Sequence, residues 1–501
     1  MQAVLLHDLI AHRAGDDARD ALVDGERTLR YGDFTRTVET YAAHLVALGV
    51  RRGDRVGILL PKSIEECAAI FAVSRAGGVF IPINPVLKVQ QVAHILADSG
   101  AKALVTNAAL LQRIADAGSG LSVLRVDEPL DTLAAAPAPV GIAEDLAAIL
   151  YTSGSTGQPK GVMLSHGNLI AGTRIVRTYL GISGADRILS ILPFSFDYGL
   201  NQLLTAVEQR AVLVLATFQL GDQIVSALER HRITGLAGVP TIWAILTKAA
   251  PTLQKTALPH LRYITNSGGA VPEATVRKLG ELLPQTEIFL MYGLTEAFRS
   301  TFLPPAEIAK RPTSIGKAIP ECEVFPVTDD GRRAKPGEPG ILVHRGPTVS
   351  LGYWRRPEET ARVIRPNPIA TPEGGGGIVC WSGDLVVEDE DGFLYFVGRR
   401  DAMIKSAGYR ISPTEIEDVL MNTGAFRQVA IIGLPDEWVG QKVCAVGVSI
   451  DADIDTKALL RKVAERLPNH MVPARLDIVP HLPQTPNGKV DYKTLVAERA
   501  S

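Results

Sequence analysis

The hydrophobic pattern of the first third of the chain alternates between strand-like and helix-like segments. Residues 54–60 form an apolar run typical of a strand, and residues 63–76 have a helical periodicity that ends at two glycines. Two more strands are predicted over residues 79–82 and 103–105, with a helix between them over residues 88–98. Strands that alternate with helices favour a parallel sheet covered by helices.

The same alternation returns in the middle of the chain. Four strand-like segments run into turns rich in Gly, Pro or Thr, and these segments are residues 211–216, 236–239, 262–265 and 287–291. In α/β sheets, ligands bind in loops beyond the carboxyl ends of the strands. The turns after these four segments are therefore predicted to form a ligand site.

The pattern changes after about residue 315, where short strands are separated by Gly and Pro turns. This spacing predicts a β-rich subdomain, in which the glycines of residues 374–377 form an exposed linker.

A small α+β unit follows a highly charged segment near Asp401. In this unit Asp455 is expected to cap a helix whose apolar face consists of Leu459, Val463 and Leu467. The sequence therefore predicts an α/β protein with two domains. The first, residues 1–400, combines packed α/β sheets with the β-rich subdomain, and the second, residues 401–501, is a small, mobile α+β domain.

The composition of this 501-residue chain is that of an ordinary globular protein, with 46% hydrophobic and 21% charged residues. Its 52 basic and 54 acidic side chains leave a formal net charge of −2, which gives no reason to propose nucleic acid or an anionic membrane as a partner. The 4 cysteines contain no C-x-x-C pair, so reduced thiols are expected. With neither a signal-peptide core nor a run near the ~20 apolar residues of a membrane helix, the sequence predicts a soluble cytoplasmic protein.

The first candidate for chemistry is a loop at residues 150–161, Leu-Tyr-Thr-Ser-Gly-Ser-Thr-Gly-Gln-Pro-Lys-Gly. Glycines let backbone N–H groups approach a phosphate, hydroxyls donate further hydrogen bonds and lysine supplies charge. The candidate phosphate-binding residues are Thr152, Ser153, Gly154, Ser155, Thr156, Gly157 and Lys160. Pro159 stands where a Walker A loop needs glycine, which disfavours a P-loop kinase. A flexible Ser/Gly turn is the alternative.

This loop resembles the signature of the adenylate-forming superfamily, which contains acyl-CoA synthetases, luciferases and the adenylation domains of peptide synthetases. Three further motifs occur in the order of that family, namely residues 291–296 (Met-Tyr-Gly-Leu-Thr-Glu), residues 382–384 with 398–401, and residues 486–489 (Pro-Asn-Gly-Lys). The overall pattern is most similar to bacterial AMP-forming acyl-CoA ligases associated with exosortase systems, particularly at residues 193–202 and 295–301.

The resemblance implies a role for each nucleotide-binding residue. Glu296 would bind the Mg²⁺ that bridges the ATP phosphates, Thr295 would contact the α-phosphate and Tyr292 would pack against adenine. Asp384 would accept hydrogen bonds from both ribose hydroxyls, a task that suits a carboxylate, and Arg399 would support the ribose.

A second glycine-rich turn follows the strand that ends near Thr265. Its backbone is flat enough to face adenine, although a simple tight turn is the alternative; the residues are Gly268, Gly269 and Ala270.

By resemblance, three residues of the small domain act in the two half-reactions. Carboxylate attack on the α-phosphorus of ATP brings two anions together, so positioning and charge neutralisation must supply most of the catalysis. By resemblance Lys489 holds both anions during adenylation. Rotation about the hinge residue Asp401 would then withdraw Lys489 and bring Gly408 to line the pantetheine tunnel.

The identity of the acid depends on Phe196, Asp197 and Arg299. Peptide-synthetase adenylation domains use a Phe-Asp pair to bind the substrate's ammonium group, but some fatty acyl ligases carry the same Asp. Asp197 follows a largely apolar, strand-like segment, so we expect its carboxylate to be partly buried and to need a partner. Arg299 either faces the acid pocket or forms a structural ion pair. We favour an acid without an amine.

The predicted function is ATP- and Mg²⁺-dependent activation of a carboxylic acid, followed by acyl transfer to the pantetheine thiol of CoA or of a carrier protein. The alternative is a stand-alone enzyme that loads an amino acid onto a peptidyl carrier protein. A non-catalytic ATP-binding protein would be expected to lose Lys489, Glu296 or Asp384, and all three are present. A luciferase-like oxygenase would share the motifs, but nothing in the sequence specifies an oxidisable substrate.

Overall fold

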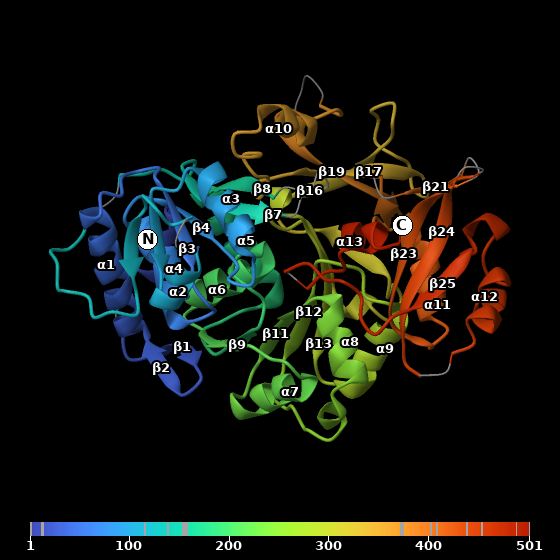
Figure 1. Ribbon diagram of the computed structural model, residues 1–501, viewed down its shortest axis with the longest axis horizontal. Helices are drawn as coiled ribbons and strands as arrows, with labels where there is room; N and C mark the ends of the chain where they lie inside the picture. Colours follow the sequence, from blue (N-terminus) through green and yellow to red (C-terminus); the bar gives the residue numbers. More distant parts are fainter. Residues whose placement is uncertain are drawn as a thin grey trace.

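The computed structural model describes residues 3–11, 15–114, 117–137, 140–152, 159–370, 375–400, 403–406, 409–436, 439–451, 454–486 and 488–499. It confirms a mixed α/β fold with a large N-terminal domain and a smaller C-terminal one (Figure 1). Among the described residues, no helix is both long enough and apolar enough to cross a bilayer.

The first sheet is parallel apart from a terminal hairpin. Its six strands, in spatial order, are β6 (Ser122–Arg125), β5 (Ala103–Thr106), β3 (Arg55–Leu59), β4 (Val79–Pro82), β7 (Leu146–Thr152) and β8 (Lys160–Ser165). The helices of this region are α1 (Tyr31–Ala47), α2 (Ile64–Arg75), α3 (Val89–Ser99), α4 (Ala108–Arg113) and α5 (His166–Leu180). Ser63 caps α2 by accepting a hydrogen bond from the backbone N–H of Glu66.

The second sheet has a parallel centre that carries most of the predicted ligand loops. Its strands at this end are β2 (Arg27–Arg30), β1 (Asp20–Asp24), β10 (Val212–Leu215), β9 (Arg187–Ser190), β11 (Gly235–Gly238), β12 (Tyr263–Asn266) and β13 (Glu287–Tyr292). The helices that follow its strands are α6 (Asp197–Gln209), α7 (Gly221–Arg230), α8 (Pro240–Lys248) and α9 (Glu273–Leu282).

The predicted β-rich subdomain continues the same sheet with antiparallel strands. These are β14 (Thr301–Leu303), β15 (Ser314–Ala318), β20 (Leu394–Arg399), β19 (Ile378–Glu388), β17 (Pro339–Arg345) and β16 (Glu323–Val327), with β18 (Ile364–Pro366) paired to β19 and α10 (Pro357–Val363) beside it. One continuous apolar core joins the two large sheets, with Phe34 of α1, Phe71 of α2 and Leu203 of α6 fully buried in it.

The C-terminal elements form a separate five-stranded sheet with its own apolar clusters. The strands are β21 (Ile404–Ser406), β22 (Tyr409–Ile411), β23 (Phe426–Asp436), β24 (Gly440–Ser449) and β25 (Arg475–Ile478), and the helices are α11 (Pro413–Met421), α12 (Thr456–Ala464) and α13 (Tyr492–Ala497). Asp455 caps α12 as predicted. Figure 1 shows these elements, orange to red, beside α8 and α9 of the large domain.

Candidate active site

The loops after four parallel strands meet at one edge of the second sheet. Residues 192–196 follow β9, Val239 follows β11, residues 267–270 follow β12 and residues 293–296 follow β13. This is the carboxyl edge of the strands, where the sequence predicted a ligand site. Gly488 and Lys489 of the small domain reach the same place, where they contact Thr241 and Gly268.

Lys489 lies at the end of a turn that begins at Thr485, and its side chain reaches Gly268 and Phe196 of the large domain. The backbone N–H of Thr485 donates to the carbonyl of Lys489 at 2.7 Å, and Gly488 occupies the left-handed region at φ +77°. The Lys489 Nζ lies 5.0 Å from the centre of the Phe196 ring. Lys489 is an exposed residue, yet desolvation by the protein atoms around it lowers the pKa of its ammonium, and the nearby carboxylates of Asp197, Glu296 and Asp384 oppose that shift.

Asp197 and Arg299 form a buried ion pair near the same edge of the second sheet. The Nη1 of Arg299 donates to Asp197 Oδ2 at 2.9 Å, and the two residues are 3% and 4% exposed, respectively. Arg299 therefore makes the ion pair that the sequence left open. The expectation that Asp197 is buried is confirmed, but its assignment to a strand-like segment is wrong. Asp197 begins α6, because an acidic residue in the first turn of a helix is stabilised by the helix dipole.

The ion pair is linked to Thr295 and to two aromatic rings. Thr295 Oγ1 lies 3.5 Å from Asp197 Oδ1, while the guanidinium carbon of Arg299 lies 4.8 Å from the centre of the Tyr198 ring and 5.6 Å from that of Phe298. Among the described residues, Arg299 Nε and Nη2 have no hydrogen-bond partner. A buried donor without a partner is costly, so these atoms are a site of unmet hydrogen-bonding demand.

Glu296 is held by a tyrosine that sequence reasoning did not identify. The hydroxyl of Tyr353 donates to Glu296 Oε1 at 2.7 Å, and Lys160 Nζ lies 5.6 Å from the centre of the Tyr353 ring. Within the described ranges, no group of three or more His, Cys, Asp or Glu side chains is placed to hold a metal. A single carboxylate suits Mg²⁺, which is commonly held by one or two carboxylates together with substrate phosphates.

Asp384 lies within β19, opposite Arg399 at the end of β20, and is hydrogen-bonded to Tyr292. The Tyr292 hydroxyl donates to Asp384 Oδ2, and Arg399 Nε lies 3.6 Å from Asp384 Oδ1. Burial and the Asp384 carboxylate raise the pKa of Tyr292, so the phenol remains protonated and keeps its role as donor. The ring of His344, which the sequence also left unmarked, stacks on Tyr292 with 6.0 Å between the ring centres.

The glycine-rich turn after β12 is shaped by close contacts. Gly268 has φ +85°, and a Cβ added there would lie 3.0 Å from Lys489 Cε and 3.3 Å from the Phe196 ring. Only glycine fits this position without displacing its neighbours. Gly269 accepts a hydrogen bond from Asn266 Nδ2 at its carbonyl, and Ala270 follows in the same turn.

Several predicted residues lie outside the described residues. They are Ser153, Gly154, Ser155, Thr156 and Gly157 of the phosphate loop, the hinge residue Asp401, and Gly408. The ends of the phosphate loop are described: Thr152 pairs with Lys160 across the β7–β8 hairpin, and Lys160 Nζ lies 4.0 Å from a carboxylate oxygen of Glu359. The domain boundary at Asp401 stays a prediction.

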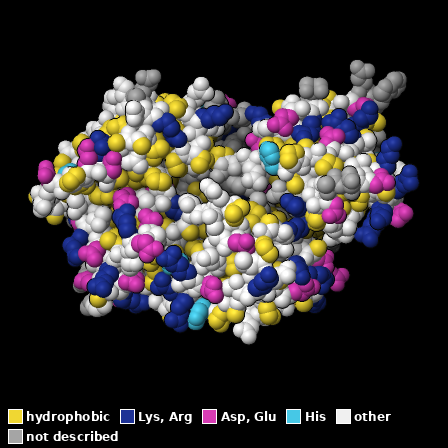
Figure 2. Space-filling model, turned by 60° about the horizontal axis from the view of Figure 1, so that its bottom comes forward, with side chains coloured by type: hydrophobic (Ala, Val, Ile, Leu, Met, Phe, Trp, Pro, Cys, Tyr) yellow, Lys and Arg dark blue, Asp and Glu magenta, His cyan; other side chains and the backbone are white. Residues whose placement is uncertain are grey.

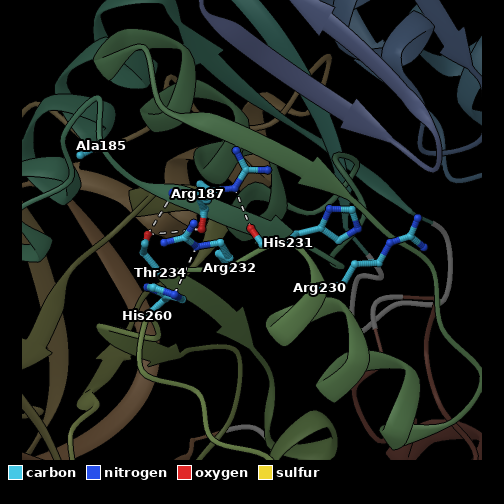
Figure 3. Close-up of a pocket in the computed structure, with 7 residues that line it drawn as sticks. All are labelled: Ala185, Arg187, Arg230, His231, Arg232, Thr234 and His260. Carbon is cyan, nitrogen blue, oxygen red and sulfur yellow. Dashed lines mark hydrogen bonds between the residues drawn. The ribbon is translucent and has the colours of Figure 1, made fainter.

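A hollow of about 330 Å³ lies at the opposite edge of the same sheet (Figure 3). It is lined by residues that precede or begin β9, β11 and β12, namely Ala185, Arg187, Arg230, His231, Arg232, Thr234 and His260. None of the residues predicted for catalysis or ligand binding lines it. On the face shown in Figure 2, basic and acidic side chains are interspersed, in keeping with the balanced charge of the chain.

The fold and the matching family models define an enzyme that activates a carboxylic acid by joining it to AMP. The chain belongs to the AMP-binding enzyme family. The family model described as AMP-binding enzyme matches residues 11–354, and the model of the AMP-binding enzyme C-terminal domain matches residues 415–489.

Relatives within this family have different acids in their names. The chain is 34% identical over 486 residues to feruloyl-CoA synthase of an Amycolatopsis species, covering 94% of each chain. It is 33% identical over 508 residues to an L-proline–[L-prolyl-carrier protein] ligase of Streptomyces coelicolor, covering 95% of this chain and 93% of the relative. Among solved structures, ATP-bound MatB from Rhodopseudomonas palustris matches with a TM-score of 0.88 and 28% identity, covering 99% of both chains.

Proposed function

We propose that this protein is an ATP-dependent acid–thiol ligase that uses Lys489 for the first of two half-reactions. A carboxylic acid is activated as its acyl-adenylate with release of pyrophosphate, and the acyl group then passes to the thiol of a pantetheine arm. The observation that carries the proposal is the position of Lys489, which the small domain inserts beside Phe196 and among three acidic side chains of the large domain. A cation at this point stabilises the two anions that must meet.

The nucleotide is assigned to the groups that surround this lysine. Asp384 accepts hydrogen bonds from the ribose with Arg399 in support, Thr295 contacts the α-phosphate, and Tyr292 lies against the adenine. Glu296, oriented by Tyr353, would hold the Mg²⁺. When bound, this ion neutralises the phosphate charge that develops as pyrophosphate leaves.

The second half-reaction is assigned to a rotated small domain. Asp401 is proposed as the hinge, and Gly408 as the residue that leaves room for the pantetheine arm once Lys489 has withdrawn. The acceptor is CoA or the phosphopantetheine of a carrier protein, because both present the same thiol. The names of the relatives support each possibility.

The acid is proposed to lack an α-amine. A substrate ammonium needs a free carboxylate, and the carboxylate of Asp197 is already paired with Arg299. The two unpartnered donors of Arg299 favour an acid with an oxygen substituent near its chain. The resemblance to exosortase-associated ligases stays a prediction about the subtype.

A hydroxylamine-trapping screen with ATP and Mg²⁺ tests the proposal. The panel contains fatty, aryl and hydroxy acids, each matched in length with an amino acid and with an unsubstituted acid. We expect hydroxamate from at least one acid without an amine, and thioester when CoA or a phosphopantetheinylated carrier replaces hydroxylamine. Saturable activation of proline or alanine that is lost in Asp197→Ala would favour the amino-acid alternative. Failure of every acid to support ATP–pyrophosphate exchange would contradict the adenylating function.

A further inference from the structure

Helix α8 of the large domain contacts the small domain at both of its ends. Near its N-terminus, Thr241 Oγ1 donates to the carbonyl of Gly488 at 2.9 Å. At its C-terminus, Lys248 Nζ donates to the carbonyl of Phe426 and lies 3.4 Å from that of Arg427. A third contact comes from the loop that follows β4, where Asn84 Nδ2 donates to the carbonyl of Pro486 at 3.3 Å.

The Thr241 contact is coupled directly to the position of Lys489. Gly488 precedes Lys489, and the turn that carries both is closed by hydrogen bonds from Thr485 to Lys489 and from Gly488 to Thr485. A turn closed in this way moves as a unit, so a bond to the Gly488 carbonyl also fixes the lysine. Lys489 is held closely enough that its Cε would lie 3.0 Å from a Cβ at Gly268.

The Lys248 contact acts at a second, distant point of the small domain. Phe426 begins β23, the strand that packs against α11 and pairs with β24 along its length. Two points of attachment restrict the rotation of a rigid body far more than one does. Residues 241 and 248 are separated by about two helical turns, or roughly 10 Å at 1.5 Å per residue.

We propose that α8 is the docking element that holds the small domain in the adenylating orientation, with Thr241 and Lys248 as its positioning residues. Both side chains donate to backbone carbonyls of the small domain, and neither donates to a group assigned to the substrates. Their loss depopulates the orientation in which Lys489 is inserted and leaves the remainder of the site intact. In a two-state equilibrium, the ratio of the two populations changes by the factor by which one state is destabilised.

The test separates the two half-reactions in the full-length protein and rests on the proposed function. Thr241→Val removes the hydroxyl donor at nearly constant shape, and Lys248→Met removes the ammonium donor from a side chain of similar length. For each variant we expect ATP–pyrophosphate exchange to fall about 2- to 10-fold in kcat, the range for one lost hydrogen bond, with KM for ATP and acid unchanged. Thioester formation from chemically prepared acyl-adenylate is expected to stay constant or to rise.

Matched controls lie on the same helix. Thr247 Oγ1 donates at 2.7 Å to the carbonyl of Trp243 within α8, so Thr247→Val should leave both half-reactions unchanged. Thr241→Ser and Lys248→Arg keep their donors and should retain exchange activity. If Thr241→Val lowers the melting temperature more than Thr247→Val does, the conclusion is drawn from the Lys248 variant, because Lys248 is exposed and its replacement disturbs the fold less.

Two results would overturn the docking role of α8. One is unchanged exchange in both Thr241→Val and Lys248→Met, and the other is an equal fall in the two half-reactions, which indicates a general distortion of the site. A wild-type protein that shows no exchange with any acid contradicts the proposed function instead.

Discussion

The two edges of the second sheet carry charged residues in very different arrangements. At the amino edge, Arg187, Arg230 and Arg232 line a hollow, and they come from two segments of the chain, the start of β9 and the residues just before β11. At the carboxyl edge, the charged groups of Asp197, Glu296, Asp384 and Lys489 come from four distant segments and are gathered by the fold.

The two edges also differ in whether the charged side chains have hydrogen-bond or ion-pair partners. Arg187 Nε donates to the carbonyl of His231 at 2.6 Å, and Arg232 Nε lies 3.2 Å from His260 Nε2 (Figure 3). Arg230 forms an ion pair with Glu26 at 2.5 Å. These contacts lie near the surface, where they contribute little to stability. The Asp197–Arg299 pair is buried and leaves donors unpartnered. Buried donors without partners, rather than the size of a hollow, distinguish the carboxyl edge from the amino edge.

The largest expected effect comes from Lys489→Ala at the carboxyl edge. Adenylation should fall at least about 100-fold, the scale of losing one preorganised charge-stabilising group. Thiol attack on supplied acyl-adenylate should be spared, because Lys489 acts only in the first half-reaction. ATP–pyrophosphate exchange and thioester formation measure the two steps, and an equal loss in both would contradict the assigned role.

Breaking the buried ion pair tests whether the carboxyl edge needs Asp197 as the counter-ion of Arg299. Asp197→Ala leaves the Arg299 guanidinium buried without its counter-ion, and we expect the free energy of unfolding to fall by about 3–5 kcal/mol. Urea denaturation measures this change. The double variant Asp197→Ala with Arg299→Met should recover most of the loss, and a double variant as unstable as the single one would show that pairing is not the cause.

The hinge prediction asks whether the carboxyl edge works in two orientations of the small domain. Proline at residue 401 fixes φ near −65° and removes a backbone donor, so Asp401→Pro should restrict rotation. We expect adenylate formation to continue while thioester formation falls about 10-fold, as for a barrier raised by 1.4 kcal/mol. Single-turnover measurements separate the steps, and unchanged overall turnover would exclude Asp401 as the pivot.

The smallest effect is expected at the amino edge. Arg187→Gln should change neither half-reaction by more than about twofold and should alter stability by no more than about 0.5 kcal/mol, as is usual for sites remote from the chemistry. A large loss of exchange activity would remove the contrast between the two edges.

The sequence predicted the elements of the large domain with small errors at their ends. The predicted strand at residues 262–265 is observed as Tyr263–Asn266, and the predicted helix at residues 88–98 as Val89–Ser99. These elements follow from local hydrophobic periodicity. The Asp197 assignment failed because the short apolar segment before it resembles a strand, whereas the chain turns into a buried helix.

The sequence identified only those site residues that belong to contiguous motifs. Glu296 and Asp384 stand in recognisable motifs, but the partners that orient them do not. Tyr353, His344 and the donor Thr241 lie far from those motifs in sequence and meet them only through tertiary packing. No periodicity or spacing in the sequence indicates such contacts.

The Asp197–Arg299 pair has a consequence for how the acid preference of such an enzyme can be changed. Replacing Arg299 by leucine would leave a buried carboxylate with no counter-ion, which costs stability. An amino acid bound with its ammonium at Asp197 would restore the missing charge. A single substitution would therefore yield a protein that is stabilised by its new substrate, so retargeting should be detectable as a rise in melting temperature with added amino acid before any turnover is measured.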